Sequence, residues 1–309
     1  MKVVRAGILG FCMGVRRAVE IAERALLENT HSDGLYTLGP LIHNSGVLEN
    51  LKKQGMICLD ENEIQSLPPG STVIIRAHGV SPVIERELLK KGIRILDATC
   101  PHVKQSQSKA RSFVESGYRL FIAGEGNHGE IAGLKGYAED GCPKRGVSAV
   151  PPCYVLGNAE EARVTAEELY HIEPEAKTAI IAQTTIRADE YRIIGETIQQ
   201  FFPSLEIVNS ICTATVDRQN ALRELVNADA IIVAGSRESA NTQRLLSLAK
   251  ETGKPAWLVE AVSDISPEIF AYETVGLSAG ASTPDELITE IEEALIYHEP
   301  RIAAAHTTI

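Results

Sequence analysis

Three cysteines of this 309-residue chain share a local pattern that favours metal chemistry. Cys12, Cys100 and Cys212 each follow a strand-like apolar segment and come directly before a helix-like segment. In parallel α/β folds such positions lie at the carboxyl ends of the strands, where ligands bind. If three such units pack around one axis, the three thiols meet. Three thiolates suit a 4Fe-4S cluster in which one iron has no protein ligand.

Zinc is the alternative metal, but structural zinc usually takes four ligands with a CxxC spacing, which this sequence lacks. A single cysteine is ordinarily interpreted as a buried apolar residue. Here the same local pattern occurs at three cysteines, and this argues against that interpretation. The other three cysteines do not share this pattern. We expect Cys58, inside a predicted strand, to lie in the core. Cys142 and Cys153 belong to a predicted surface insertion and are expected to do nothing catalytic.

Polar side chains follow the remaining predicted strands. Helix N-termini offer spare N–H groups and a partial positive charge, so several aimed at one point form an anion site, which imidazole, hydroxyl and amide groups complete. We therefore predict that a phosphate or diphosphate group binds beside the cluster. The residues concerned are His43, His78, His128, Thr184, Ser239, Asn241 and Ser282.

Glu130 is the residue that we expect to deliver a proton. It is a carboxylate in a loop that carries a histidine two residues earlier. A carboxyl group held beside the ligand can act as a general acid, with Thr184 or a water positioning it. Each polar residue also has an ordinary structural alternative: a helix-capping hydroxyl, a hydrogen-bonded core histidine, or a first-turn acid that complements the helix dipole.

The elements that must position these residues alternate between strands and helices. We predict strands at 3–9, 34–38, 56–59, 72–76, from 93 to the segment before Cys100, and at 118–123, 178–182, 205–209, 230–234 and 274–279. Helices are predicted at 15–27, 45–53, from Pro82 onward, and at 103–115, 188–202, 216–226 and 242–250. Residues 140–153, rich in Gly and Pro, are predicted to be a surface insertion.

This alternation predicts an α/β fold built from three pseudo-threefold-related modules, with short parallel sheets around a central cluster cavity. The expected modules are residues 13–99, residues 100–211 with the insertion 140–153, and residues 212–309. The third module lacks one strand, which the N-terminal segment 1–12 is expected to supply.

Composition narrows the function classes. A net charge of −11 disfavours nucleic acid and anionic membranes as partners, because neutralising phosphates requires a basic face. No apolar run approaches the length of a membrane span, and the N-terminus lacks a cleavage site, which favours a cytoplasmic protein. In such a reducing compartment cysteines are usually ligands or free thiols. No dinucleotide fingerprint is present, so electrons are expected from a protein carrier.

Eight motifs together resemble the 4-hydroxy-3-methylbut-2-enyl diphosphate reductase family, also called IspH/LytB. They are GFCMGV (10–15), IHN (42–44), AHGV (77–80), DATCP (97–101), HGE (128–130), QTT (183–185), ATVDRQ (214–219) and AGAS (279–282). The resemblance covers nearly the whole chain in the expected order. It implies an oxidoreductase that removes the hydroxyl of its substrate to give isopentenyl and dimethylallyl diphosphate, the last step of the non-mevalonate isoprenoid pathway.

The resemblance also implies roles for individual residues. Cys12, Cys100 and Cys212 would hold one 4Fe-4S cluster with an open iron, and Glu130 and Thr184 would deliver protons. A ferredoxin or flavodoxin would donate electrons, and the family's diphosphate ligands fall on His43, His78, His128, Ser239, Asn241 and Ser282. Ala240 departs from the pattern, since family members often have serine there.

Two other functions remain open at this point. A quinolinate synthase-like dehydratase would share the three-cysteine cluster but would bind carboxylates and perform no net reduction. A non-enzymatic metal-binding protein, with iron–sulfur or zinc, would have neither activity. The products formed from the diphosphate substrate separate the first alternative, and the colour and iron content of anaerobically purified protein separate the second.

Overall fold

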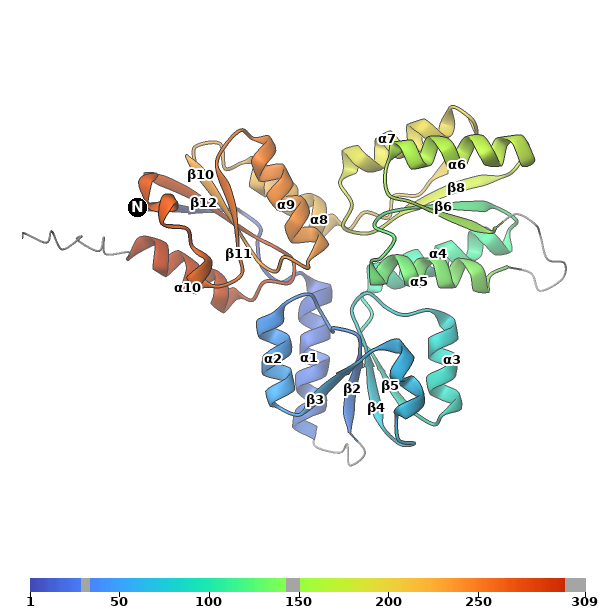
Figure 1. Ribbon diagram of the computed structural model, residues 1–309, viewed down its shortest axis with the longest axis horizontal. Helices are drawn as coiled ribbons and strands as arrows, with labels where there is room; N and C mark the ends of the chain where they lie inside the picture. Colours follow the sequence, from blue (N-terminus) through green and yellow to red (C-terminus); the bar gives the residue numbers. More distant parts are fainter. Residues whose placement is uncertain (29–33, 143–150, 298–309) are drawn as a thin grey trace, which may run out of the picture.

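The structure is a computed structural model that describes residues 1–28, 34–142 and 151–297. These residues form three α/β lobes around a common centre (Figure 1). Each lobe contains one four-stranded sheet, and every strand pair is parallel, with strand orders β3-β2-β4-β5, β7-β6-β8-β9 and β1-β12-β10-β11. The predicted fold class is confirmed.

The first lobe contains the chain from α1 to β5. Small residues on one face of α1, among them Ala18 and Ala22, are fully buried and let this helix pack closely on the sheet. Its strands are β2 (Leu35–Leu38), β3 (Met56–Leu59), β4 (Thr72–Ile75) and β5 (Arg94–Asp97). Its helices are α1 (Met13–Glu28), α2 (Ser45–Lys53), η1 (Glu61–Ser66) and α3 (Pro82–Lys90).

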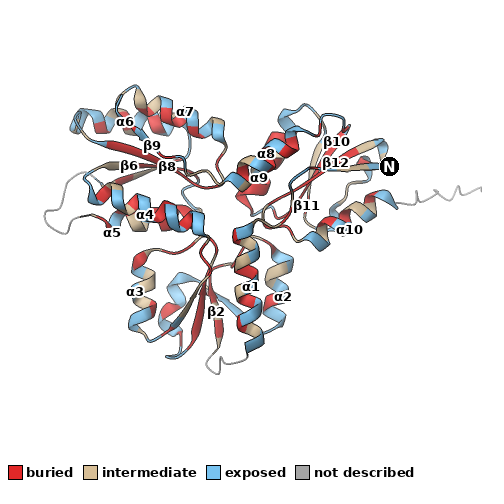
Figure 2. Cartoon of the chain, turned by 180° about the vertical axis from the view of Figure 1, so that it is seen from behind, coloured by how far each residue is buried: buried red, intermediate tan, exposed pale blue. Residues whose placement is uncertain are grey.

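The second lobe follows directly. Its central strands are buried at every position except Arg119, as expected for parallel strands covered by helices on both faces (Figure 2). The strands are β6 (Arg119–Ala123), β7 (Cys153–Leu156), β8 (Thr178–Ala182) and β9 (Glu206–Ile207). The helices are α4 (Pro101–Glu115), α5 (Gly129–Asp140), α6 (Ala159–Ile172) and α7 (Ala188–Gln199).

The third lobe combines both ends of the described chain. Its strands are β10 (Ala230–Ala234), β11 (Ala256–Val259), β12 (Thr274–Ala279) and β1 (Lys2–Arg5). Its helices are α8 (Thr213–Arg223), α9 (Ala240–Glu251), η2 (Val262–Asp264), η3 (Pro267–Ala271) and α10 (Asp285–Ile296). β1 pairs with β12 from Lys2↔Thr274 to Arg5↔Leu277, so the N-terminal strand completes this sheet.

The prediction of a surface insertion at 140–153 is wrong at its C-terminal end. Cys153 begins β7, which pairs with β6, and its side chain is buried in the core of the second lobe. The Gly- and Pro-rich residues before it obscured the short apolar strand. Helix α6, which follows β7, was not predicted. Residues 143–150 lie outside the described part of the chain.

The prediction that Cys58 is a core residue is also wrong. Cys58 does lie in a strand, but its side chain is exposed. β3 forms the edge of its sheet, and of its four residues only Met56 is buried. Edge strands are covered less completely than central ones, and a strand pattern in the sequence does not distinguish the two.

Within the described residues, no helix is both long and apolar enough to cross a membrane.

Candidate active site

A cavity at the centre of the molecule is lined by residues from all three lobes. Helices α1, α4 and α8 begin near the point where the lobes meet (Figure 1). The structure brings together all eleven residues that the sequence singled out: Cys12, His43, His78, Cys100, His128, Glu130, Thr184, Cys212, Ser239, Asn241 and Ser282. They come from loops that follow strands in three separate sheets, so the position at the carboxyl ends of the strands explains the convergence.

The three cysteines occupy equivalent positions in the fold. Cys100 and Cys212 are the N-cap residues of α4 and α8, and Cys12 comes directly before α1. Burial raises the pKa of the Cys100 and Cys212 thiols, whereas backbone N–H groups of the following helical turn lower it. The charge of Cys12 also raises the pKa of both, so the three sulfurs lie within electrostatic range of one another.

Two glycines near Cys12 allow close packing around the site. A Cβ atom at Gly14 would lie 2.6 Å from the Sγ of Cys100, so α1 can begin beside this sulfur only because it has no side chain there. Gly10 has a φ of +78°, a left-handed conformation that glycine adopts without strain, and a Cβ there would lie 2.9 Å from the Oδ1 of Asp285. Both glycines belong to the GFCMGV motif.

Three histidines, which we call the His group, lie close together in the same cavity as the cysteines. His43 follows β2, His78 follows β4, and His128 is the N-cap of α5 after β6. Their ring centroids are 4.8 Å, 5.6 Å and 5.0 Å apart, and each ring is half-buried. Burial is the largest effect on all three, and it lowers the pKa of His43 and His78 and that of His128 to about 4. The three imidazoles are therefore neutral near pH 7.

The spacing of the three rings would also permit a metal ion, but a hydrogen bond of His128 disfavours this use. The Nδ1 of His128 accepts the N–H of Glu130 at 3.2 Å, so the proton of the neutral ring is on Nε2. A protonated nitrogen donates to an anion and cannot ligate a metal. This tautomer favours recognition of phosphate oxygens.

Glu130 and Thr184 form a buried pair. The Oε1 of Glu130 accepts the backbone N–H of Thr184 at 2.7 Å, and its Oε2 lies 2.9 Å from the Oγ1 of Thr184. Glu130 is 1% exposed, and this burial raises its pKa to about 7 although both hydrogen bonds oppose the shift. A carboxyl group that holds or releases a proton near neutral pH is thus present at the cavity wall.

The third lobe contributes the remaining predicted side chains. Ser239 caps α9 by accepting the N–H of Thr242 at 3.3 Å. Asn241 is 4% exposed, and neither its Oδ1 nor its Nδ2 has a partner among the described residues, as expected for a side chain that awaits a ligand. The Oγ of Ser282 donates to the carbonyl of His43 at 2.9 Å and so connects the third lobe to the first.

Sequence reasoning missed two arginines that act on this site. Arg76 and Arg244 both lower the pKa of His128, in addition to the larger effect of burial, so they contribute positive potential where an anion would bind. Arg244 also donates to the Oγ1 of Thr185 at 3.1 Å and pairs with Glu125 at 2.8 Å. Arg76 directly follows β4, and Arg244 lies within α9. Neither position belongs to a sequence motif that could have indicated a role at the site.

The chemistry of the sulfur site fits a cluster better than a single ion. Among the described residues, the His group is the one set of histidine, cysteine and carboxylate ligand atoms that is spaced for a single metal ion, and the three cysteines are not part of such a set. Three half-buried free thiols with N–H donors aimed at two of them, and a glycine beside Cys100, form the kind of site that binds iron and sulfide.

Comparisons with known proteins agree with this geometry. Residues 3–296 match the family described as LytB protein. The chain is 42% identical to a 4-hydroxy-3-methylbut-2-enyl diphosphate reductase of Treponema denticola, with 96% of this chain and 99% of that protein covered. It is 36% identical to the protein of the same name from Aquifex aeolicus, with 93% of each chain covered.

Two solved structures share the fold. The E-1-hydroxy-2-methyl-but-2-enyl-4-diphosphate reductase from Plasmodium falciparum superposes with a TM-score of 0.86 at 27% identity, covering 97% of this chain and 89% of that one. A second structure, described as (E)-4-hydroxy-3-methyl-but-2-enyl diphosphate reductase, the terminal enzyme of the non-mevalonate pathway, gives a TM-score of 0.68 at 33% identity and covers 96% of this chain and 99% of that one.

Proposed function

The chain belongs to the LytB protein family, and on this premise we propose that it reductively removes the hydroxyl group of 4-hydroxy-3-methylbut-2-enyl diphosphate. The products are isopentenyl and dimethylallyl diphosphate, and the reaction is the last step of the non-mevalonate isoprenoid pathway. The observation that carries this proposal is the meeting of three thiols, three neutral imidazoles and a buried carboxyl group in one cavity.

The protein is an iron–sulfur oxidoreductase, and we propose that Cys12, Cys100 and Cys212 hold one 4Fe-4S cluster. The free thiols, the N–H donors aimed at two of them and the space beside Gly14 support this assignment. When bound, the cluster supplies single electrons and an iron without a protein ligand that polarises the substrate hydroxyl. A ferredoxin or flavodoxin is proposed as electron donor, since the sequence has no dinucleotide fingerprint.

The His group is proposed to bind the diphosphate. The Nε2–H of His128 can donate to a phosphate oxygen, and the unpaired amide of Asn241 can donate from the opposite lobe. Arg76 and Arg244 add positive potential. The remaining ligands are proposed to be His43, His78, Ser239 and Ser282. Since these groups come from all three lobes, one diphosphate would hold the lobes in a single arrangement.

Glu130 is proposed to supply the proton that the leaving hydroxyl needs. Its Oε1 is occupied by the N–H of Thr184, so the transferable proton belongs on Oε2, which faces the Oγ1 of Thr184. That hydroxyl can accept the proton and pass its own onward. The overall step takes two electrons and two protons: the C–O bond breaks, the oxygen leaves as water with one of these protons, and carbon receives the other.

The proposal also includes the module boundaries, the cellular location and the partners expected from the sequence. We propose module boundaries of 13–99, 100–211, and 212–309 together with 1–12, and a cytoplasmic location, which suits a protein whose described cysteines are all free thiols. Neither nucleic acid nor a membrane is proposed as a partner, given the net charge of −11. The dehydratase and the non-enzymatic alternatives receive no support from the relatives, which bear reductase names.

The test is an anaerobic assay. Protein reconstituted with iron and sulfide, and given a strong one-electron reductant, is expected to convert the diphosphate substrate into two isomers that have lost oxygen, as measured by mass spectrometry. Each of the variants Cys12→Ser, Cys100→Ser and Cys212→Ser should lose the brown colour. The variants Cys58→Ser, Cys142→Ser and Cys153→Ser are matched controls that should keep it. A colourless wild type, or a product that retains the oxygen, contradicts the proposal.

A further inference from the structure

A buried cation in α8 has no role in the function proposed above. Arg218 is 3% exposed, yet it forms no ion pair with a carboxylate in the described part of the chain. A guanidinium group stays protonated in proteins, and burying it without an anion is costly. The charge of Arg218 therefore needs a negative partner that the carboxylates do not provide.

The contacts of Arg218 lead to two of the cluster cysteines. Its Nη2 donates to the carbonyl of Gly10 at 2.6 Å, and its Nη1 donates to the carbonyl of Ala214 at 2.8 Å. Gly10 is two residues before Cys12, and Ala214 is two residues after Cys212. One side chain thus connects the two segments that carry these cysteines, although the Arg218–Gly10 bond spans 208 residues of sequence.

A further donor of Arg218 is unused. Its Nε is buried and has no partner among the described residues. Burial lowers the pKa of Arg218, and the charges of Cys12 and Cys212 are the largest effects that raise it. The two cysteines therefore act more strongly on this cation than Asp217, the carboxylate that also raises its pKa.

We propose that Arg218 is a positioning residue of the cluster site: it holds the segments of Cys12 and Cys212 together and offsets the negative charge of their thiolates. This inference rests on the cysteine assignment in the proposed function. Positive charge and N–H donors near the sulfurs of a cluster favour its reduced, more negative state. Arg218 therefore raises the reduction potential of the bound cluster.

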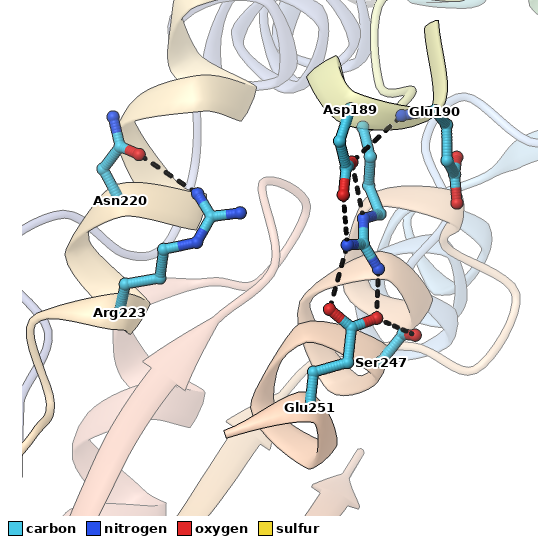
Figure 3. A network of polar contacts seen from close by, with 7 residues as sticks. Asp189, Glu190, Asn220, Arg223, Ser247 and Glu251 are labelled. Carbon is cyan, nitrogen blue, oxygen red and sulfur yellow. Dashed lines mark hydrogen bonds and ion pairs between the residues drawn. The ribbon is translucent and has the colours of Figure 1, made fainter. Parts of the chain in front are cut away.

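The test compares two variants on one helix. Arg218→Gln removes the charge and keeps N–H donors. Arg223→Gln is the matched control, since Arg223 lies in the last turn of α8, is exposed and contacts Asn220 (Figure 3). In anaerobic redox titrations followed by EPR, we expect Arg218→Gln to lower the reduced-to-oxidised ratio about tenfold at a fixed potential, equal to a shift of about 59 mV. Arg223→Gln should leave it unchanged.

A second readout needs neither cluster nor activity. In the cluster-free protein, Arg218→Gln should lower the Tm more than Arg223→Gln does, because it loses hydrogen bonds that connect the segments of Cys12 and Cys212.

The outcomes separate this inference from the proposed function. If the wild type binds no cluster, the proposed function fails, while the Tm comparison still tests the connection that Arg218 makes. If the wild type binds a cluster but Arg218→Gln leaves its reduction potential unchanged, the inference is overturned. Should Arg218→Gln not fold, Arg218→Lys decides, because it keeps the charge: a wild-type potential supports the inference, and a lowered potential overturns it.

Discussion

At the scale of single residues, the chemistry depends on how the protein tunes ordinary side chains. Burial keeps Glu130 protonated up to about pH 7 and keeps the three histidines neutral, with the pKa of His128 at about 4. The cavity therefore contains a proton donor and uncharged N–H donors at the same pH. In water at this pH a free carboxyl group would be ionised and a free imidazole would still be partly protonated, because their pKa values are about 4 and about 6.5.

Replacing Glu130 by Gln tests the donor directly. The amide side chain of Glu130→Gln would keep the shape and one hydrogen bond to Thr184 but would carry no transferable proton, so we expect turnover to fall about 10²-fold. Iron content and binding of the diphosphate should stay near wild type. Steady-state kinetics and iron analysis measure these effects, and an unchanged kcat would exclude Glu130 as the donor.

The pH dependence of the reaction follows from the same carboxyl group. Glu130 is protonated below its pKa of about 7 and ionised above it. The donor form is thus lost as the pH rises, and kcat should decline by about tenfold for each pH unit well above 7. Single-turnover rates between pH 6 and 9 provide the measurement, and in Glu130→Gln this decline should disappear. A rate that is flat across this range would contradict the assignment.

Ala240 offers a gain of binding. It is the first residue of α9, lines the cavity and is 7% exposed, but its methyl group cannot form a hydrogen bond. In Ala240→Ser the new hydroxyl should bind a diphosphate oxygen and tighten substrate binding by about 1 kcal/mol, or about fivefold. Isothermal titration with the cluster-loaded protein would measure this. Weaker binding would show that the hydroxyl is directed away from the ligand or displaces it.

At the scale of elements, helix N-termini place the reactive groups. Cys100, Cys212, His128 and Ser239 are all N-caps. Each comes after a strand of one of the three sheets. The positive end of each helix dipole then acts on thiolate or phosphate. The sequence signals of capping and of chemistry coincide at these positions, which explains why a cap is also a ligand here.

Gly14 tests how closely these elements must approach. In Gly14→Ala the added Cβ would lie 2.6 Å from the Cys100 Sγ, so either α1 or the sulfur must move, at a cost of about 1–3 kcal/mol. We expect most of the cluster to be lost, measured as iron per chain and absorbance near 400 nm. Gly46→Ala is the matched control in α2, because its Cβ would lie 3.5 Å from the Asn44 Oδ1 and should be tolerated.

At the scale of the whole molecule, the cavity exists only while three lobes keep their positions. Polar groups provide several of the contacts between them. Arg187, the N-cap of α7, reaches across to Glu251 at the end of α9 and also pairs with Asp189 at 2.7 Å, as Figure 3 shows for the two carboxylates. Its side chain is 12% exposed, so this network is better shielded than an ordinary surface ion pair.

Breaking this network should loosen the second lobe from the third. For Arg187→Gln we expect a loss of about 1 kcal/mol and a Tm lower by about 2–4 °C. KM should rise more than kcat falls, because the diphosphate must then hold the lobes together itself. Arg192→Gln is the control, since Arg192 pairs with Glu196 inside α7 and is exposed. Equal effects of the two substitutions would show that Arg187 does not act between the lobes.

The sequence by itself determined the α/β class and most strands to within a few residues. It also identified the eleven predicted site residues, all of which line the cavity. These features are local: an apolar run of strand length, a polar loop residue and a helix start can be recognised in a short window. The same local view misplaced Cys58, because strand periodicity does not reveal which strand is at an edge, and it missed β7, because a short strand after a Gly- and Pro-rich segment has little pattern.

Only the tertiary structure decided which groups act on one another. The tautomer of His128, the raised pKa of Glu130 and the contacts of Arg218, Arg244 and Arg187 depend on burial and on neighbours in space. Desolvation and Coulomb interactions depend on distance in space. Residues 208 positions apart, such as Gly10 and Arg218, come into contact only when the N-terminal strand has joined the sheet of the third lobe.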